Sequence, residues 1–382
     1  MKGLILSGGA GKRLRPITHT SAKQLVPVAN KPILFYGIEE MASAGITDIG
    51  IVVAPATGDE IRQAVGDGSK FGVRVTWIPQ HAPLGLAHCV LVASDFLADD
   101  DFVMYLGDNM LEAGLAAFVD RFVSARTGSG TSRSYGGAPS AQILLARVSD
   151  PGSFGVAEIG PDGRLLRLVE KPEKPPSDLA LVGVYLFDKT IHDAVEQIEA
   201  SARGELEITD AIDWLIAEGY RVDHEVLSGW WIDTGKKDPL LECNRLVLDT
   251  FGRSIEGDVD DASSVDGQVV LEAGAKVIDS TVRGPAIIGS GTTVEHSDIG
   301  PYVSIAADCR ISGSEIDNSV VLRRSTVSDI ARLTDSLVGR DTVLSRSTRA
   351  GEAGRGGADG PEGPGPGAVR VMVGDHCRVE IE

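Results

Sequence analysis

The chain has 382 residues and carries 36 Lys and Arg against 55 Asp and Glu, which gives a formal net charge of −19. This length exceeds one ordinary domain and predicts two, each large enough to bury its own core. The acidic balance argues against a nucleic acid or an anionic membrane as the main partner, because phosphate-rich surfaces are bound by basic patches.

Short apolar runs alternate with helical segments through the first part of the chain. This alternation predicts an α/β domain with a Rossmann-like, mixed but mostly parallel sheet that is covered by helices. Ligands of such sheets bind beyond the carboxyl ends of the strands, so the loops after Leu6 and Leu106 are the expected sites. The expected strands are Lys2–Leu6, Ile49–Ala54, Val73–Ile78, Phe102–Leu106, Gln142–Val148, Leu165–Val169, Leu181–Phe187 and Arg221–Leu227.

Composition changes near residue 250. Of the 19 aromatic residues (4 Trp, 6 Tyr and 9 Phe), Phe251 and Tyr302 alone lie beyond it. Aliphatic residues in this region recur every 17 positions in three rows, which predicts coils of three short strands stacked into a β-solenoid. The rows are Val265, Val282, Ile299, Ile316 and Leu333; Leu271, Ile288, Ile305 and Leu322; and Val277, Val294 and Ile311.

The expected domains are therefore residues 1–250 and a tail at 251–382 with coils of 17 or 18 residues. Residues 349–368 contain eight Gly and three Pro, which predicts a disordered insert because this composition cannot bury a core. A second loop is expected at Arg126–Ser140. No apolar stretch approaches the about 20 residues of a membrane span, no signal peptide is apparent, and the four Cys are scattered. We expect a reduced, cytoplasmic protein.

A glycine-rich loop with cations follows the first strand. Its sequence is Leu6-Ser7-Gly8-Gly9-Ala10-Gly11-Lys12-Arg13-Leu14. Backbone N–H groups in such a loop can approach phosphate oxygens, and the cations neutralise them. Walker A would need Ser or Thr in place of Arg13, and the dinucleotide fingerprint would need Gly in place of Leu14. By itself, the loop is compatible with either a phosphate site or a structural turn.

The next motif makes the comparison specific. Together with Lys23-Gln24-Leu25-Val26-Pro27, the loop resembles the signature of sugar-1-phosphate nucleotidyltransferases, and Lys-Gln-Leu resembles glucose-1-phosphate thymidylyltransferases in particular. The resemblance covers residues 1–250, and the tail resembles the left-handed β-helix of the family's long form. Further matching motifs, in chain order, are Gln80 with Pro83–Ala87, Leu106–Asn109, Phe154–Val156, Glu170–Pro172, Gly204–Asp210 and Trp231–Gly235.

The resemblance implies a reaction in which an oxygen of glucose 1-phosphate attacks the α-phosphorus of dTTP and pyrophosphate leaves in line. It gives catalytic roles to Arg13 and Lys23 on the triphosphate and to Lys171 on the sugar phosphate. Asp108 and Asp233 correspond to ligands of Mg²⁺. The implied nucleotide-binding residues are Leu6, Gly8, Gly9, Gly11, Lys12, Arg13, Lys23, Gln24, Gln80, Pro83, Gly85, Leu86 and Asp108. The implied sugar-phosphate-binding residues are Asn109, Phe154, Gly155, Glu170, Lys171, Val182 and Trp231.

Three positions in these motifs depart from the usual family pattern. Lys12 stands where the family often has Thr or Ser, Ser7 stands where it often has Ala, and Phe154 stands where short-form relatives often have Tyr. Lys12 adds a charge to the nucleotide loop, whereas Phe154 lacks a hydroxyl beside the sugar. In the last-but-one motif, Glu207 and Asp210 are expected to begin a helix at Ile212–Glu218 rather than to contact substrate.

Three alternatives stay open. The first is a nucleotidyltransferase for another pair, such as UTP or an amino-sugar 1-phosphate, because one methyl group gives only about 1–3 kcal/mol of discrimination. The second is a non-catalytic regulatory or assembly subunit, although every implied catalytic cation and carboxylate is present. The third is an acyltransferase site in the tail that uses His296 or His376. A long solenoid face also predicts a homo-oligomer.

Overall fold

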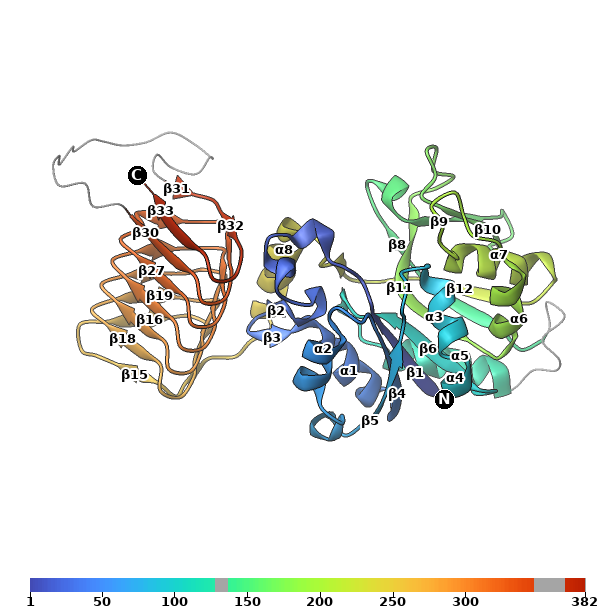
Figure 1. The fold of residues 1–382 in the computed structure, drawn as a ribbon, viewed down its shortest axis with the longest axis horizontal. Coiled ribbons are helices and arrows are strands. Elements are labelled where there is room, and N and C mark those ends of the chain that lie inside the picture. Colours follow the sequence, from blue (N-terminus) through green and yellow to red (C-terminus); the bar gives the residue numbers. More distant parts are fainter. Residues whose placement is uncertain (128–136, 347–367, 382) are drawn as a thin grey trace. The chain divides into compact units, whose positions relative to one another are not determined.

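The computed structural model describes residues 1–127, 137–346 and 368–381. The chain forms two compact units, one of Met1–Ala10 with Ile33–Asp233 and one of Gly11–Pro32 with Thr234–Glu382 (Figure 1). Most of the predicted insert at 349–368 and of the predicted loop at Arg126–Ser140 lies outside the described residues. Ala368, which was expected to end the insert, instead begins a strand.

The first unit is built on a nine-stranded sheet. Its β5-β4-β1-β6 half is parallel, as predicted. In the other half, β11 runs antiparallel to β6, β8 and β9, and β12 runs parallel to β8, so the parallel character does not extend across the sheet. The strands are β10 (Leu165–Glu170), β9 (Gly155–Ile159), β11 (Leu179–Phe187), β6 (Phe102–Leu106), β1 (Lys2–Ser7), β4 (Asp48–Val53), β5 (Arg74–Pro79), β8 (Ala141–Arg147) and β12 (Val222–Val226).

Helices cover both faces of this sheet (Figure 1). Successive side chains of a strand point to opposite faces, and β6 illustrates the result: Met104 joins a buried cluster with residues of α3, α6 and α7, while the ring of Tyr105 packs against Gly37 of α1. Strands buried on both sides explain the continuous apolar runs in the sequence. The helices are α1 (Ile33–Ser43), α2 (Gly58–Val65), α3 (Leu86–Val92), α4 (Ser94–Leu97), α5 (Ala116–Thr127), α6 (Thr190–Gln197) and α7 (Ile208–Ala217).

Shorter elements complete the first unit. β7 (Asn109–Leu111) and β13 (Trp231–Asp233) form a separate antiparallel pair. Two 3₁₀ turns, η4 (Ser69–Phe71) and η5 (Pro151–Ser153), lie between larger elements. The helix expected at Ile212–Glu218 begins earlier, at Ile208, directly after Glu207. No helix in the described parts of the chain is long and apolar enough to cross a membrane.

The tail of the second unit consists of parallel strands in three sheets, consistent with the predicted left-handed β-helix. The first sheet contains β14 (Ser254–Ile255), β17 (Val269–Leu271), β20 (Ala286–Ile288), β23 (Val303–Ile305), β26 (Val320–Val321), β29 (Leu337–Val338) and β32 (Met372–Val373). The second contains β15 (Asp258–Val259), β18 (Lys276–Ile278), β21 (Thr293–Glu295), β24 (Arg310–Ser312), β27 (Thr326–Ser328), β30 (Val343–Arg346) and β33 (Arg378–Ile381). The third contains β16 (Ser264–Asp266), β19 (Thr281–Arg283), β22 (Asp298–Ile299), β25 (Glu315–Ile316), β28 (Arg332–Leu333) and β31 (Ala368–Val369).

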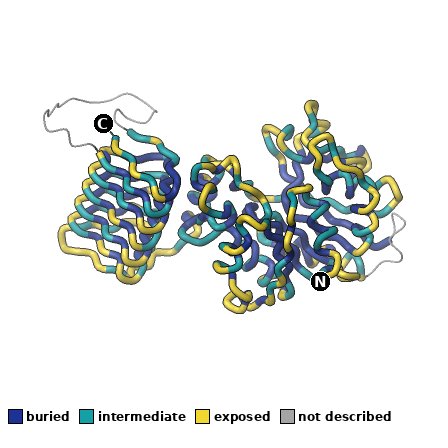
Figure 2. Tube along the Cα trace, viewed as in Figure 1, coloured by how far each residue is buried: buried dark blue, intermediate teal, exposed yellow. Residues whose placement is uncertain are grey.

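The register of the coils follows the predicted aliphatic rows with one correction. Val277 lies opposite Val294, and Val294 opposite Ile311, as expected. Opposite Ile305, however, lies Val321 and not Leu322. A coil shortened by one residue causes this shift, so the row continues from Val321. These side chains are buried in a single aliphatic core, and Figure 2 shows buried positions repeating from coil to coil.

Polar ladders satisfy the turns of the β-helix. The backbone N–H of Ser297 donates to Ser280 Oγ at 3.0 Å, and the N–H of Ser314 donates to Ser297 Oγ at 3.1 Å. His296 and His376 occupy turn positions with φ of 49° and 57°, in line with Asp279 and Asp341 of the preceding coils. Nε2 of His296 lies 3.6 Å from an oxygen of Asp279, and Nδ1 of His376 lies 3.7 Å from an oxygen of Asp341, so each histidine contacts an acidic residue of the preceding coil.

The second unit also contains two segments that the predicted boundary at residue 250 placed elsewhere. Gly11–Pro32 forms 3₁₀ turns η1 (Lys12–Leu14), η2 (Ile17–His19) and η3 (Lys23–Leu25), and the strands β2 (Pro27–Val28) and β3 (Lys31–Pro32). It packs with α8 (Lys237–Leu248) and the tail. The buried Asn244 Oδ1 of α8 accepts hydrogen bonds from Ala29 N at 2.9 Å and Ser304 Oγ at 2.7 Å, which ties the three segments together.

Candidate active site

The loop after β1 lies against the loop after β5. A Cβ on Gly8 would come within 2.9 Å of Gln80 Oε1, so the backbone at Gly8 passes close to the Gln80 side chain. Gln80 is 7% exposed, and its Nε2 donates to the carbonyl of Gly85 at 3.3 Å. The same nitrogen lies 3.1 Å from Nδ1 of His88, a residue that the sequence analysis did not single out. The structure thus brings the predicted residues Gly8, Gln80 and Gly85 together.

The backbone conformation and the surroundings of Gly85 also favour glycine. Its φ is 103°, and a Cβ there would lie 2.3 Å from the carbonyl oxygen of Leu206. Backbone hydrogen bonds on both sides hold this contact: Leu206 N donates to Leu84 O at 2.7 Å, and Ala87 N donates to Leu206 O at 3.1 Å. The start of α3 is therefore fixed against the Gly204–Asp210 motif. Of the other predicted residues here, Pro83 is exposed and Leu86 packs on the core.

The two predicted metal carboxylates are connected by the β7–β13 pair. Asp233 is the Cα partner of Asn109, the residue after Asp108. Asp108 is 7% exposed and lies in the turn after β6. A Cβ on the preceding Gly107 would lie 2.8 Å from Ser7 Oγ and 3.0 Å from Leu6 O. Strands separated by more than 100 residues therefore bring these two acids to the same end of the sheet.

These carboxylates suit a hard cation such as Mg²⁺. Among the described residues, no group of three or more His, Cys, Asp or Glu could hold a metal ion. Mg²⁺ does not need such a cage, because it usually keeps several waters and binds through one or two carboxylates plus substrate phosphates. A carboxylate on β13 and a second one in the turn before its partner strand β7 fit that requirement.

Aromatic and amide groups surround Asn109. Trp231 Nε1 donates to Asn109 Oδ1 at 2.5 Å, and the hydroxyl of Tyr105 donates to Asn109 O at 2.7 Å. The rings of Phe154 and Trp231 meet edge to face with centroids 5.2 Å apart. Asn109, Phe154 and Trp231, which were predicted separately for the sugar phosphate, form one contiguous cluster.

The second cluster of predicted sugar residues is centred on Glu170. Glu170 is the register partner of Gly155, and a Cβ on Gly155 would lie 3.2 Å from Glu170 Oε2. Lys171 Nζ lies 3.2 Å from Glu170 Oε1. Lys171 adopts φ 42°, a left-handed conformation that costs lysine about 1–3 kcal/mol and is concentrated at functional sites. Val182 is buried on β11, within the stretch where the β11–β8 register shifts.

Arg203 is a polar residue of this cluster that the sequence analysis did not single out. Its Nη2 donates to Glu170 Oε1 at 3.1 Å and to Glu207 Oε1 at 2.7 Å. Glu207 is 4% exposed, so the expectation that it merely begins a helix is incomplete. Burial, with repulsion from Glu207 and Glu170, raises the pKa of Asp210. The available signal was the position of Arg203, which directly precedes the Gly204–Asp210 motif.

The predicted triphosphate cations lie on Gly11–Leu25, in the second unit. Gly11 has φ 59°, and a Cβ there would lie 2.9 Å from Lys23 Cβ. Thr18 Oγ1 donates to Gly11 O at 2.7 Å, which closes the segment on itself. Lys12 and Arg13 are exposed, whereas Gln24 is 1% exposed, and its Oε1 has no hydrogen-bond partner in the described structure. A buried acceptor of this kind normally has a partner, so Gln24 is a candidate ligand contact.

The family that the sequence motifs predicted is confirmed by comparisons with known proteins. The chain matches the nucleotidyl transferase family over residues 2–250. It is 51% identical over 381 residues to glucose-1-phosphate thymidylyltransferase of Streptomyces griseus, covering 100% of this chain and 99% of the relative. The protein of the same name from Streptomyces antibioticus is 50% identical over 382 residues and is covered completely. A crystal structure from Bacillus anthracis, described as a glucose-1-phosphate thymidylyltransferase in complex with sucrose, is 34% identical with a TM-score of 0.59; the match covers 66% of this chain and 98% of that one.

Proposed function

This chain belongs to the nucleotidyl transferase family, and we propose that it is a glucose-1-phosphate thymidylyltransferase. The substrates are dTTP and α-D-glucose 1-phosphate, and the products are dTDP-glucose and pyrophosphate. The observation that carries the proposal is whole-chain identity of about one half to two relatives of that name. The strand pair that joins Asp233 to Asn109 supports a phosphoryl-transfer site in the same region.

The reaction forms one bond and breaks one bond at phosphorus. A phosphate oxygen of glucose 1-phosphate attacks the α-phosphorus, and the bond from that phosphorus to the bridging oxygen of pyrophosphate breaks in line. Arg13 and Lys23 neutralise the triphosphate and the departing pyrophosphate, and Lys171 holds the phosphate of the sugar. No protein nucleophile is required, so the chain acts by positioning and by charge.

Asp108 and Asp233 would hold Mg²⁺. When bound, this ion supplies charge neutralisation for phosphate oxygens. Asp108 and Asp233 contribute hard oxygen ligands, and the low exposure of Asp108 favours ion contacts over solvation.

Recognition of the two substrates divides between separate groups of residues. Gln80 and the Gly85 backbone read the pyrimidine edge, and Gln24 offers its buried amide oxygen to the nucleotide. Glu170 and Asn109 read hydroxyl groups of the hexose, because an unmatched hydroxyl would leave a buried polar group unpaired. The remaining proposed contacts are Leu6, Gly8, Gly9, Gly11, Lys12, Pro83 and Leu86 for the nucleotide and Phe154, Gly155, Val182 and Trp231 for the sugar phosphate.

Arg203 joins this proposal on the strength of its contacts. Because it donates to Glu170, it fixes the orientation of the carboxylate that reads the sugar. Its guanidinium also brings a second positive charge beside Lys171, next to the proposed place of the sugar phosphate.

A substrate panel tests the proposal. The purified full-length chain with Mg²⁺ is given dTTP or UTP in combination with glucose 1-phosphate or glucosamine 1-phosphate, and pyrophosphate release is measured. We expect the highest kcat/KM for dTTP with glucose 1-phosphate. A preference for UTP or for the amino sugar would replace the proposed substrates, and no release from any pair would support a regulatory subunit instead.

We also propose a cytoplasmic location and a homo-oligomeric state. The first follows from the scattered cysteines, and the second from the long face of the β-helix. Gel filtration with light scattering tests the oligomer, and a strict monomer would contradict it.

A further inference from the structure

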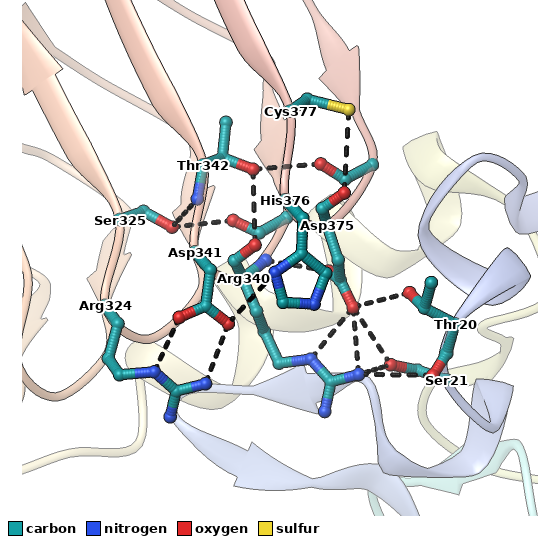
Figure 3. A network of polar contacts seen from close by, with 12 residues as sticks. Thr20, Ser21, Arg324, Ser325, Arg340, Asp341, Thr342, Asp375, His376 and Cys377 are labelled. Carbon is teal, nitrogen blue, oxygen red and sulfur yellow. Dashed lines mark hydrogen bonds and ion pairs between the residues drawn. The ribbon is translucent and has the colours of Figure 1, made fainter.

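The last coil of the β-helix holds the segment that carries the proposed nucleotide cations. Asp375, in the turn after β32, accepts hydrogen bonds at Oδ2 from Thr20 Oγ1 at 2.7 Å and from Ser21 Oγ at 3.2 Å. The same oxygen accepts from Arg340 Nε at 2.9 Å. Arg340 Nη2 contacts Ser21 Oγ and donates to Thr20 O at 3.4 Å. Figure 3 shows Thr20 and Ser21 on one side of this network and Arg340 with Asp375 on the other.

The network is buried enough to fix a geometry. The Asp375 side chain is 0% exposed and that of Arg340 is 21% exposed. Burial disfavours the Asp375 carboxylate, but hydrogen bonds from Thr20 and Arg340 outweigh it and lower its pKa. The pair also satisfies backbone, since Arg340 N donates to Asp375 Oδ1 at 2.7 Å. Removing one member of a buried pair is costly because the other charge is left uncompensated.

Packing reinforces these polar contacts. A Cβ on Gly374 would lie 3.0 Å from Pro16 Cβ and 3.3 Å from Pro16 O. The last coil therefore touches Gly11–Leu25 at Pro16 and again at Thr20 and Ser21. These positions lie between Arg13 and Lys23, which carry the proposed triphosphate contacts.

We propose that Arg340 and Asp375 are positioning residues that set nucleotide affinity by fixing the Gly11–Leu25 segment. The inference rests on the proposed function, in which Arg13 and Lys23 bind dTTP. Through this network, the last coil of the tail fixes the positions of Thr20 and Ser21, which lie between Arg13 and Lys23 in the sequence. The tail thereby takes part in nucleotide binding without contacting the nucleotide.

The β-helix supplies a matched control. Arg324 also forms an arginine–aspartate pair, in which its Nε donates to Asp341 Oδ1 at 2.6 Å and its Nη2 donates to Asp341 Oδ2 at 2.7 Å. Both of these hydrogen bonds stay within the tail, and Figure 3 shows the pair beside the Arg340 network. Arg324→Gln therefore removes a neighbouring, more exposed arginine–aspartate pair of the β-helix and leaves Thr20 and Ser21 in contact with Asp375.

The experiment compares Arg340→Gln, Arg340→Lys and Arg324→Gln in the full-length protein. We expect Arg340→Gln to raise KM and Kd for dTTP roughly tenfold, the effect of losing one charged hydrogen-bonded contact. The KM for glucose 1-phosphate should change by less than about twofold, because Lys171 lies outside the segment. Arg340→Lys retains the charge and should recover part of the loss, and Arg324→Gln should match the wild type.

Hydrogen exchange separates this inference from the proposed function. Without substrate, amides of residues 11–25 should exchange faster in Arg340→Gln than in Arg324→Gln. Unchanged exchange together with a wild-type Kd for dTTP would overturn the positioning role. Wild-type protein that binds no dTTP by calorimetry would overturn the proposed function and the nucleotide role of the network, whatever the exchange shows. If Arg340→Gln does not fold, Thr20→Val combined with Ser21→Ala removes the same contacts from the other side.

Discussion

The α/β sheet and the β-helix bury polar groups for different purposes. In the sheet, buried Asp108 and Glu207 come from strand and helix ends that are distant in sequence. In the β-helix, buried Ser280, Ser297 and Ser314 are spaced 17 residues apart and satisfy backbone N–H groups of the next coil. A buried polar residue that repeats is structural, whereas one that does not repeat is a candidate for function. Asp375 belongs to the repeating coils, but its side chain also accepts hydrogen bonds from Thr20 and Ser21, which lie outside the coils.

Asp108→Asn should give the largest effect. It tests whether a buried polar residue that does not repeat contributes to function. Loss of the carboxylate removes a proposed metal ligand, so kcat/KM for dTDP-glucose formation should fall at least about 100-fold. Circular dichroism and the thermal midpoint should stay close to wild type. The control is Asp279→Asn, which changes an exposed turn residue of the β-helix. Activity of Asp108→Asn equal to that of this control would refute the proposed role.

Gly85→Ala tests whether the sheet domain tolerates any change at its nucleotide loop. The added Cβ would meet Leu206 O at 2.3 Å, so backbone must move. We expect the free energy of unfolding to fall by about 3 kcal/mol, together with weaker dTTP binding.

Gly72→Ala is the matched control for this substitution. Gly72 has φ 72° but no atom within 4 Å of its added Cβ. Gly72→Ala therefore measures only the cost of the left-handed backbone conformation for alanine, which is about 1 kcal/mol. Urea denaturation of both variants measures the difference. Equal destabilisation would show that the contact with Leu206 contributes nothing.

Ser297→Ala tests whether a buried polar residue that repeats from coil to coil contributes to stability and not to catalysis. Ser297 Oγ accepts from Ser314 N at 3.1 Å and donates to Glu295 O at 2.7 Å. Alanine would remove the acceptor of the Ser314 N–H, whereas Glu295 O would keep its hydrogen bond from Gly313 N at 3.1 Å. The free energy of unfolding of the tail should fall by about 1–2 kcal/mol while kcat is unchanged. The exposed Ser264 is the control, and Ser264→Ala should stay within about 0.5 kcal/mol of wild type. If Ser297→Ala lowered kcat without lowering the free energy of unfolding, the serine ladder would contribute to catalysis, and its purely structural role would be refuted.

Asp210→Asn should give the smallest effect, and its sign depends on pH. Burial first, then repulsion from Glu207 and Glu170, raises the folded-state pKa of Asp210 above its ordinary value. The folded state therefore binds this proton more tightly than the unfolded state. The stability from that proton is fully present below the unfolded pKa and is lost as pH rises through the folded pKa.

Thermal midpoints of wild type and Asp210→Asn at several pH values measure this dependence. Asparagine should raise the midpoint at neutral pH, and its advantage should shrink as the pH falls below the ordinary range of carboxyl groups. A difference that does not vary with pH would contradict the assignment to Asp210.

The sequence by itself determined the local features of this protein. Continuous apolar runs identified the expected strands of the sheet, because strands covered on both faces need no polar alternation. The interval of 17 residues identified the β-helix, since stacked coils repeat each buried position. Ordered motifs predicted the family, which the family match confirms, and they supplied the candidate site residues.

Only the tertiary structure decided which segments meet. It moved the aliphatic row from Leu322 to Val321, since one shortened coil shifts the pairing that a fixed interval would predict. It brought Arg203 to Glu170 and joined Thr20 and Ser21 to Asp375, across separations of 33, 355 and 354 residues. Periodicity records which face of an element is buried. It does not show which distant element packs against that face, because this packing depends on the tertiary fold of the whole chain.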